Sequence, residues 1–293
     1  MQIGIRAQSA MEYLMTYGWA ILIIAVVLGA LFELGVFSGT FFMPHVPPGA
    51  CHVFRPYGPR TVGSINLEGE CQGALPQYVA EFNGAVYITI RNSIGGTSGS
   101  TTNTITYAAW VKTTNPSAQA IFESGVHSGF MIDRSGQVFL HECSPGDTGI
   151  TVNNSMQLYS GTWNFVAIVY SDGSLTGYVD GSHAQTNTSL YGLSPIPPPV
   201  IGNLATIGYD QCDGAEYLNG FISNVQVYNA SLSANDIQAL YQEGIGGAPQ
   251  NLQNLVGWWP LNGNANDYSG NNNYGTATNV VYTTNWESGY TQP

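Results

Sequence analysis

The sequence predicts a mainly β protein, a β-sandwich or jelly roll, preceded by one long hydrophobic helix. Three features predict it. From Gln77 onward, short runs rich in β-branched and aromatic residues are separated by turn dipeptides such as Asn83-Gly84 and Asp172-Gly173. Before that point, residues 8–37 form one largely apolar stretch. Only 8% of residues are charged, yet 44% are hydrophobic, so this is not the composition of a disordered chain.

Eight runs after Gln77 are predicted strands because each shows a strand-like pattern between turn residues. They are residues 85–90, 104–112, 119–123, 130–133, 138–141, 163–170, 175–180 and 220–228. One helix is predicted after the last of them. Ser233 is a good N-cap with Asp236 three positions later, and Gly244 ends the helical pattern.

The apolar stretch Gln8–Phe37 predicts a membrane-spanning helix. From Tyr17 onward it is apolar for about twenty residues, the length that a ~30 Å hydrocarbon core requires. One acid, Glu33, lies near its end, and a short leader, residues 1–7, precedes it. A secretory signal loses its apolar core on cleavage. Here the small-residue junction comes before that core, so cleavage at the junction would leave the helix on the mature chain.

The residues around this junction carry a resemblance. Arg6, Ala7, Gln8, Ser9 and Glu12, in this order before an apolar run, resemble the class III signal peptide of archaeal type IV pilins. The resemblance implies that a prepilin peptidase removes the leader and leaves Gln8 first. Glu12 then stands fifth, where the amino group of a neighbouring pilin subunit would neutralise its carboxylate and set the register of assembly. The alternative is an uncleaved signal anchor.

Composition excludes a nucleic-acid binder and favours an extracellular domain. The chain has 6 Lys and Arg against 18 Asp and Glu, a net charge of −12, which leaves too few cations to bind a phosphate backbone. Its 36 glycines and 18 tyrosines suit a β-sandwich that faces water or glycans. Three sequons, at Asn153, Asn187 and Asn229, are candidates for N-glycosylation, although a chain this rich in Asn, Ser and Thr also produces sequons by chance.

Four cysteines follow the apolar stretch, and an even count in an exported chain indicates disulfides. Sequence alone allows three connectivities. We favour Cys51–Cys71, inside a proline-containing linker of residues 38–76, and Cys143–Cys212 within the main domain. A metal site is disfavoured because no pair has C-x-x-C spacing.

The region after the linker carries a second resemblance, through five motifs. They are Phe82-Asn83-Gly84, Trp110-Val111-Lys112, Trp163-Asn164-Phe165-Val166-Ala167, Tyr178-Val179-Asp180-Gly181 and Leu218-Asn219-Gly220-Phe221-Ile222-Ser223-Asn224-Val225-Gln226-Val227-Tyr228. With the helix that follows, they resemble the laminin-G-like domains of the concanavalin A-like lectin/glucanase jelly rolls, over about 165 residues. The resemblance implies a laminin-G-like β-sandwich over residues 77–293.

The C-terminal segment, residues 251–293, resembles the opening strand and loop of the same fold through Leu255–Gly270. In the family this strand comes first. We expect a circular permutation in which the segment completes the sandwich, because so short a tail would not fold alone and chain termini usually lie close together. A truncated second domain and a strand donated to a neighbouring subunit are the alternatives.

The same segment holds the candidate metal ligands. Asn264, Asn266, Asp267 and Asn271 offer oxygen atoms at the close spacing that Ca²⁺ prefers. The same side chains equally suit capping of their own turns. We expect that no cofactor is required, with Ca²⁺ as the one candidate.

Two adjacent tryptophans are the candidate sugar-binding residues. Trp258 and Trp259 point to opposite faces if they lie on a strand. We expect one of them in the core and the other exposed, where its ring can stack on a sugar.

The sequence does not predict an enzyme. Retaining glycosidases of this fold need two carboxyl groups ~5–5.5 Å apart, and on one strand these would read E-x-D-x-E. That string is absent, and the nearest acids, Asp210, Asp213 and Glu216, surround Cys212 with the spacing of a loop. A nucleophile elbow and a nucleotide-binding loop are absent too.

These inferences together predict a structural and adhesive pilin-like subunit. Its N-terminal helix anchors it in the membrane or in a surface filament with other pilin subunits, and its extracellular lectin-like domain attaches to glycans or cell surfaces. The alternatives are a membrane-anchored carbohydrate-binding protein and an S-layer-associated protein, neither of which assembles into filaments.

Overall fold

The computed structural model describes residues 4–33, 44–73, 75–94, 96–124, 128–142, 148–152, 158–188, 198–212, 214 and 216–293. The chain forms two compact units, Met1–Met43 and Pro44–Pro293. Within its described residues, the first unit is a single helix, α1 (Gly4–Glu33). The helix predicted from Gln8 is therefore present and starts four residues earlier, inside the predicted leader; residues 34–37 lie outside the described part.

The predicted processing and assembly residues, Arg6, Ala7, Gln8 and Glu12, all lie on α1. Side chains on α1 are described for Met15 and for residues 17–31 only. Most of the large apolar side chains in that part are exposed: Met15, Tyr17, Trp19, Ile21, Leu22, Ile23, Ile24, Val26, Val27 and Leu28. In the described part of the chain, no helix has both the length and the apolar character needed to span a membrane.

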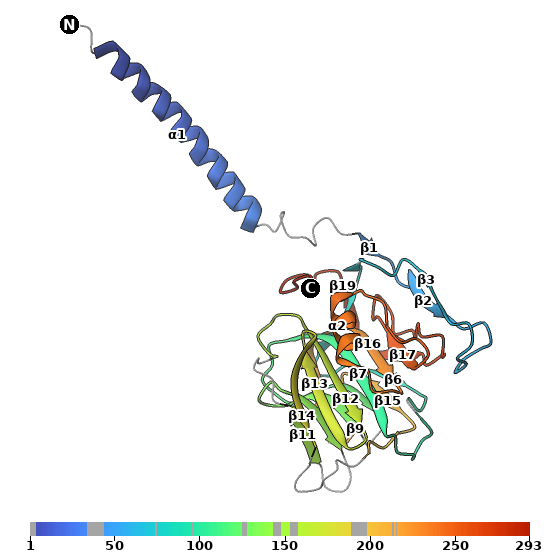
Figure 1. Ribbon diagram of the computed structural model, residues 1–293. Helices are drawn as coiled ribbons and strands as arrows, with labels where there is room; N and C mark the ends of the chain where they lie inside the picture. Colours follow the sequence, from blue (N-terminus) through green and yellow to red (C-terminus); the bar gives the residue numbers. More distant parts are fainter. Residues whose placement is uncertain are drawn as a thin grey trace. The chain divides into compact units, whose positions relative to one another are not determined.

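The second unit is a β-sandwich of two antiparallel sheets (Figure 1). Within the described residues, the sheet here named the β7 sheet has eight strands, in the order β14-β13-β12-β7-β16-β5-β19 with β17 also paired to β16. The β8 sheet has seven, in the order β11-β10-β9-β8-β15-β6-β18.

The strands of the β7 sheet are β5 (Val79–Asn83), β7 (Thr104–Thr113), β12 (Asn164–Ser171), β13 (Ser174–Val179), β14 (Ser182–Asn187), β16 (Asn219–Tyr228), β17 (Leu255–Trp259) and β19 (Val281–Thr283). Those of the β8 sheet are β6 (Tyr87–Ile90), β8 (Gln119–Ser124), β9 (Ser128–Ile132), β10 (Val138–Glu142), β11 (Thr148–Val152), β15 (Ala205–Ile207) and β18 (Gly275–Thr278). All eight predicted strands are present, each with its ends within two residues of the prediction.

Central strand β7 shows how the two faces of its sheet are used. Tyr107 points into the space between the sheets, where its ring lies 5.4 Å from Phe122 and 6.1 Å from Phe130 of the β8 sheet. Trp110 points to the opposite face and stacks on Tyr241, with ring centroids 5.8 Å apart. Both faces of β7 are therefore buried, which explains why its sequence reads as a continuous apolar run.

Tyr241 belongs to helix α2 (Ala234–Gln242), the helix predicted after the last strand. Its N-cap is Ser233, whose hydroxyl accepts a hydrogen bond from Asp236 N while the Asp236 carboxylate accepts one from Ser233 N, a complete capping box. Gly244, at φ 82°, follows the helix in the left-handed conformation that suits a helix end.

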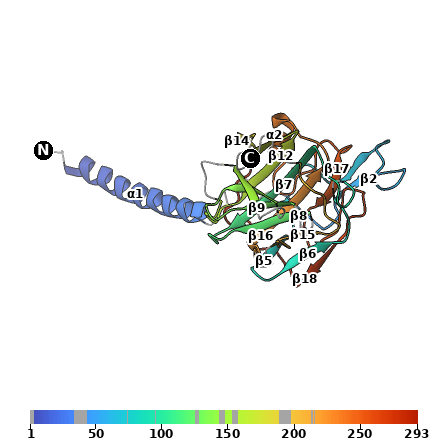
Figure 2. The ribbon, with the colours of Figure 1, turned by 90° about the horizontal axis from the view of Figure 1, so that it is seen from below.

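The C-terminal segment adds strands to both sheets of its own chain. β17 pairs with β16, β18 with β6 and β19 with β5, all antiparallel. Figure 1 shows β17 beside β16, and Figure 2 shows β18 beside β6. The segment is thus part of the sandwich in this chain, while the permutation of the chain order stays a prediction.

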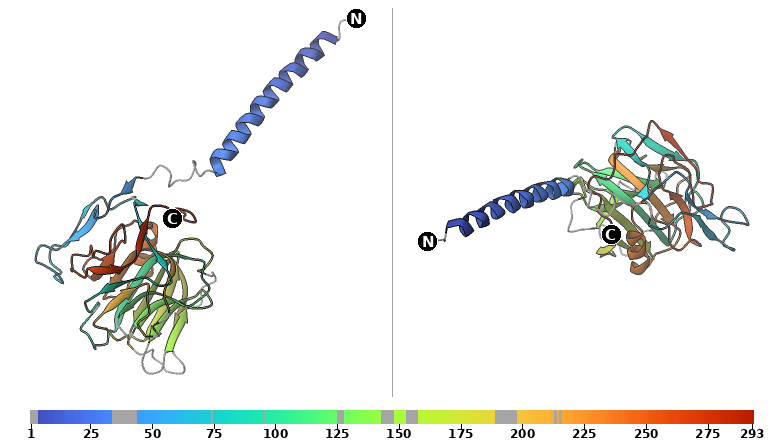
Figure 3. Two further views of the ribbon diagram at one scale, coloured as in Figure 1. Left: turned by 180° about the vertical axis from the view of Figure 1, so that it is seen from behind. Right: turned by 90° about the horizontal axis from the view of Figure 1, so that it is seen from above.

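Residues 44–76, predicted as a linker, belong to the second unit. They form β1 (His45–Val46) with β4 (Leu75–Pro76), and a hairpin of β2 (Cys51–Phe54) and β3 (Asn66–Gly69) that the disulfide Cys51–Cys71 closes, as predicted. The hairpin lies against the C-terminal segment (Figure 3), where Val53 N donates to Tyr268 O at 2.8 Å. The boundary lies at 43/44 rather than at 76, because hydrogen bonds over more than 200 residues of sequence join the hairpin to the sandwich.

Candidate functional site

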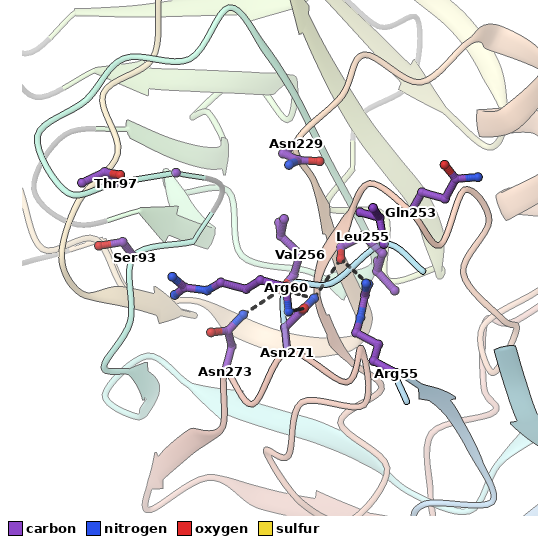
Figure 4. Close-up of a pocket in the computed structure, with 12 residues that line it drawn as sticks. Arg55, Arg60, Ser93, Thr97, Asn229, Gln253, Leu255, Val256, Asn271 and Asn273 are labelled. Atoms are coloured by element: carbon purple, nitrogen blue, oxygen red, sulfur yellow. Dashed lines mark hydrogen bonds between the residues drawn. The ribbon is translucent and has the colours of Figure 1, made fainter. Parts of the chain in front are cut away.

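A pocket of about 250 Å³ lies where the hairpin meets the sandwich (Figure 4). Three parts of the chain enclose it: the hairpin loop, the loop after β6, and the two ends of the C-terminal segment's first loop. Its lining residues are Arg55, Arg60, Val62, Ser93, Gly96, Thr97, Asn229, Gln253, Leu255, Val256, Asn271 and Asn273.

The floor of the pocket is built by amide side chains that are fully engaged. Asn271 Nδ2 donates to Leu255 O at 2.9 Å and Val256 O at 3.2 Å, and Asn273 Nδ2 donates to Val256 O at 2.7 Å. These bonds satisfy backbone carbonyls at the start of β17, where no strand partner accepts them. The floor is therefore rigid, and a ligand would meet a preorganised surface.

Below the floor, Asp267 holds the C-terminal loop together. It is buried, and its carboxylate accepts four hydrogen bonds: Oδ1 from Trp258 N and Ser269 N, Oδ2 from the Ser269 hydroxyl and Asn273 N, all at 2.8–3.0 Å. Desolvation raises the pKa of this carboxyl, while the hydrogen bonds act in the opposite direction. Both oxygens are thus used for folding the loop.

Arg55 joins the hairpin to this loop. Its side chain is buried, and its guanidinium donates to four carbonyls, those of Ser269, Thr61, Leu252 and Leu255, at 2.5–3.0 Å. Desolvation lowers its pKa, and the charge of Asp267 opposes that shift. Arg55 therefore acts mainly as a structural clamp on one wall of the pocket.

Arg60 has a different position, because it is exposed and its guanidinium makes no hydrogen bond or ion pair with the described residues. Only its backbone is tied down: Arg60 N donates to Asn271 Oδ1 at 2.8 Å, and φ is 62°. A non-glycine residue in this left-handed region costs of order 1–2 kcal/mol. Figure 4 shows the Arg60 side chain extending over the pocket.

The rim carries polar side chains that are available to a ligand. Within the described part of the chain, no hydrogen bond engages the side chains of Ser93, Thr97, Asn229 or Gln253, and the last three are exposed. The lining has no aromatic residue and no carboxylate. The pocket can therefore offer amides, hydroxyls and a cation, but no ring to stack on.

The structure gives the predicted Ca²⁺ ligands other bonds. Asn264 Oδ1 accepts from Asn266 N at 2.9 Å, an Asx turn, and Asn271 Oδ1 accepts from Arg60 N. Asp267 is saturated by its four donors. Turn capping, the alternative reading of these residues, accounts for the hydrogen bonds seen here, and binding of Ca²⁺ stays a prediction.

The expectation that Trp258 or Trp259 is exposed for a sugar is wrong. Trp258 is 2% exposed and Trp259 0%. They do point to opposite faces of β17, but both faces are covered: Trp258 Nε1 donates to Asn224 Oδ1 at 2.7 Å, and Trp259 Nε1 donates to Asn273 O at 2.9 Å while its ring packs 5.7 Å from Phe122. The predicted ligand-binding role therefore falls to other residues.

The remaining predicted residues are partly described. Cys212 is disulfide-bonded, and Cys143 lies outside the described residues, as does Asn153. Asn187 is half-buried on β14 and accepts a hydrogen bond from Gln185 at 2.9 Å. Asn229, at the end of β16, is exposed on the rim of the pocket.

A second polar cluster is buried on the face of the β8 sheet that points away from the core. Glu123 and Asp210 are 1% and 0% exposed, and His141 Nδ1 lies 3.3 Å from Asp210 Oδ2. Glu123 accepts a hydrogen bond from Gln211 N. Since Cys212, the other neighbour of this cluster, is in a disulfide, it has no thiolate for a metal ion.

The proton distribution in this cluster is asymmetric. Desolvation, added to by the charge of Asp210, raises the pKa of Glu123 to about 9. Desolvation would raise the pKa of Asp210 as well, but hydrogen bonds from His141 and from Cys212 N outweigh it and lower that pKa. At neutral pH, Glu123 is therefore protonated and Asp210 ionised, in a buried pair that solvent does not reach.

Sequence reasoning missed both arginines and Glu123. Arg55 and Arg60 lie in the segment interpreted as a linker, and their partners are 197–214 residues away in sequence. The available signal was scarcity: in a chain with 6 Lys and Arg, two lie six positions or fewer apart in this segment.

A family comparison agrees with this architecture. Residues 82–238, just over half of the chain, match the Laminin_G_3 family model, described as the concanavalin A-like lectin/glucanases superfamily. The chain belongs to this family. The second resemblance noted in the sequence is thereby confirmed for the laminin-G-like domain. By sequence, no curated protein matches the chain.

Solved structures share the fold at low identity. A protein of Bacteroides ovatus to which carbohydrate binding has been ascribed has 16% identity and a TM-score of 0.53; the match covers 76% of this chain and 64% of that one. A SAP-like pentraxin of Limulus polyphemus has 16% identity and a TM-score of 0.49, over 71% and 94% of the two chains. A sialyllactose-bound carbohydrate-binding module of a Ruminococcus gnavus sialidase has 17% identity and a TM-score of 0.42, over 58% and 98%.

Proposed function

We propose that the protein is a surface protein that binds glycans through the pocket lined by Arg60 and does not cleave them. The observation that carries the proposal is the combination of a rigid amide floor with free hydroxyl, amide and guanidinium groups on the rim. Sugar hydroxyls need many hydrogen-bond partners of both kinds, and preorganised partners lower the cost of binding. The lectin-like fold and the carbohydrate binding ascribed to the Bacteroides ovatus protein support the same reading.

Binding without cleavage is favoured by the placement of the acids. Glycoside hydrolysis needs two carboxyl groups beside the bound sugar, one of them an acid and the other a base or nucleophile. The lining of the pocket has none. Glu123 and Asp210 form the one buried acid pair described above, but they hydrogen-bond to each other and are closed to solvent.

The N-terminal helix supports a further part of the proposal, that the domain is displayed outside the cell by a pilin-like or membrane-anchored segment. The exposed apolar side chains along α1 favour a helix that packs in lipid or against copies of itself. The Arg6–Glu12 pattern favours cleavage before Gln8 and assembly with other pilin subunits. N-terminal sequencing of protein from its native cell surface tests this part: a start at Gln8 is expected, and a start at Met1 would contradict the pilin reading.

A glycan array with the full-length chain in mild detergent tests the binding proposal. Thr97→Trp, at an exposed rim position, fills the mouth of the pocket and should abolish binding to every glycan that the wild type retains. Thr276→Trp, at an exposed position on β18 outside the lining, is the matched control and should bind like the wild type. Equal binding by Thr97→Trp and the wild type would show that the pocket is not the glycan site.

A further inference from the structure

We infer that the pocket is specific for acidic sugars, with the carboxylate bound by the Arg60 guanidinium. The inference rests on the proposed function, glycan binding at this pocket, and adds the chemical class of the sugar. It comes from the charge of the lining, from the free state of Arg60 and from the way the fold presents this residue.

The lining concentrates positive charge in an acidic protein. The chain has 6 Lys and Arg and 18 Asp and Glu, yet two of those six cations and none of the acids line this pocket. Screening limits charge effects to about 8 Å at physiological ionic strength, so a ligand in the pocket meets the local arginines rather than the net charge of −12. A neutral sugar would make no use of this arrangement.

The two arginines have different duties. Arg55 spends its guanidinium on four backbone carbonyls, and the buried charge of Asp267 lies near enough to affect its pKa. Arg60 has no such partners among the described residues. Its planar group can therefore form the two parallel hydrogen bonds that a carboxylate accepts.

The presentation of Arg60 is specific to that residue. The Asn271 carboxamide, itself fixed by Leu255 O and Val256 O, holds the backbone of Arg60 in a left-handed conformation. Glycine would satisfy this conformation without strain. An arginine that is held there at a cost in stability favours a functional use of its side chain.

The lining also lacks the usual means of binding neutral sugars. No aromatic residue lines the pocket, and the apolar part is limited to side chains such as Val62, which is 68% exposed, and Val256. Affinity must then come from hydrogen bonds and charge. Charge-assisted hydrogen bonds are about twice as strong as neutral ones, so an acidic sugar gains most here.

The test compares sugars that differ only in the acid. Polymer-linked glucuronic acid and glucose, galacturonic acid and galactose, and sialyllactose and lactose are titrated against the full-length chain. At least one acidic member should bind tenfold or more tightly than its neutral counterpart, and added salt should weaken that binding. Arg60→Gln should remove the difference, and Arg60→Lys, which keeps the charge but not the planar fork, should restore part of it.

The control variant is Arg134→Gln, which removes one positive charge from an exposed turn outside the lining. It should bind like the wild type, and Arg60→Gln should melt at the wild-type temperature because the bond from its backbone N–H is kept. If acidic and neutral members bind equally, or Arg60→Gln keeps the preference, the inference is overturned while glycan binding stands. If no sugar of any pair or of the glycan array binds, both the inference and the proposed function fail.

Discussion

Replacing Glu123 by Gln is expected to stabilise the protein at neutral pH. The burial of Glu123 raises its pKa to about 9, whereas the unfolded carboxyl titrates near 4.5. Between these values the folded chain holds a proton that the unfolded chain has lost, so stability is present below about pH 4.5 and is lost as pH rises toward 9. The loss is ~1.4 kcal/mol per pH unit, or about 3 kcal/mol at pH 7.

The carboxamide of Glu123→Gln copies the protonated acid. Its oxygen can accept from Gln211 N and its amide can donate to the Asp210 carboxylate, the bonds that protonated Glu123 makes. It does not titrate, however. The variant should therefore match the wild type at pH 4.5, exceed it by about 3 kcal/mol at pH 7, and show a flatter pH profile of unfolding free energy.

Urea unfolding of the full-length chain in mild detergent, at intervals from pH 4.5 to 9, measures both profiles. Asp210→Asn is the matched control, since it makes the same chemical change in the ionised member of the pair. It leaves His141 without its anion and should destabilise the fold by about 3 kcal/mol. If Glu123→Gln destabilises and Asp210→Asn stabilises, the proton lies on Asp210 and the reasoning is refuted.

Three further predictions concern the pocket and its support. Arg55→Met removes a guanidinium that satisfies four carbonyls and should lower the unfolding free energy by about 3 kcal/mol in a denaturant titration, with detachment of the hairpin visible as faster hydrogen exchange in residues 51–69; unchanged exchange would contradict the clamp. Asp267→Asn turns one acceptor into a donor facing two donors and should cost about 2–4 kcal/mol in the same titration, with or without Ca²⁺, whereas a loss seen only with Ca²⁺ would indicate a metal site. Asn229 should carry glycan in glycopeptide mass spectrometry of the exported protein, because its sequon is exposed after β16, and a consistently bare Asn229 would contradict this.

The fold was predictable because its signals are local. Strands such as β7 and β16 are marked by apolar runs between Asx-Gly turns, and α2 by the Ser233–Asp236 capping pair, so both kinds of element were found within a few residues. The packing partners of a strand were less accessible. β17 was expected to leave one tryptophan exposed, but Asn224 and the loop after β17 cover Trp258.

The pocket was not predictable, because no local pattern marks it. Arg60 and Asn271 meet across 211 residues of sequence, and each has an innocuous local reading, as a linker residue and as a turn cap. The same holds for Glu123, which ends a predicted strand and is buried only because the loop with Asp210 folds over it. Such sites depend on tertiary contacts, which a periodicity does not encode.

The most direct test of the account is a crystal structure of the chain bound to the sugar that it prefers on the glycan array. The account predicts sugar density over the Asn271 and Asn273 floor, within hydrogen-bonding distance of the Arg60 guanidinium. Density elsewhere, for example against the partly exposed tyrosines Tyr87, Tyr209 and Tyr217 of the β8 sheet side, with the pocket empty, would contradict it.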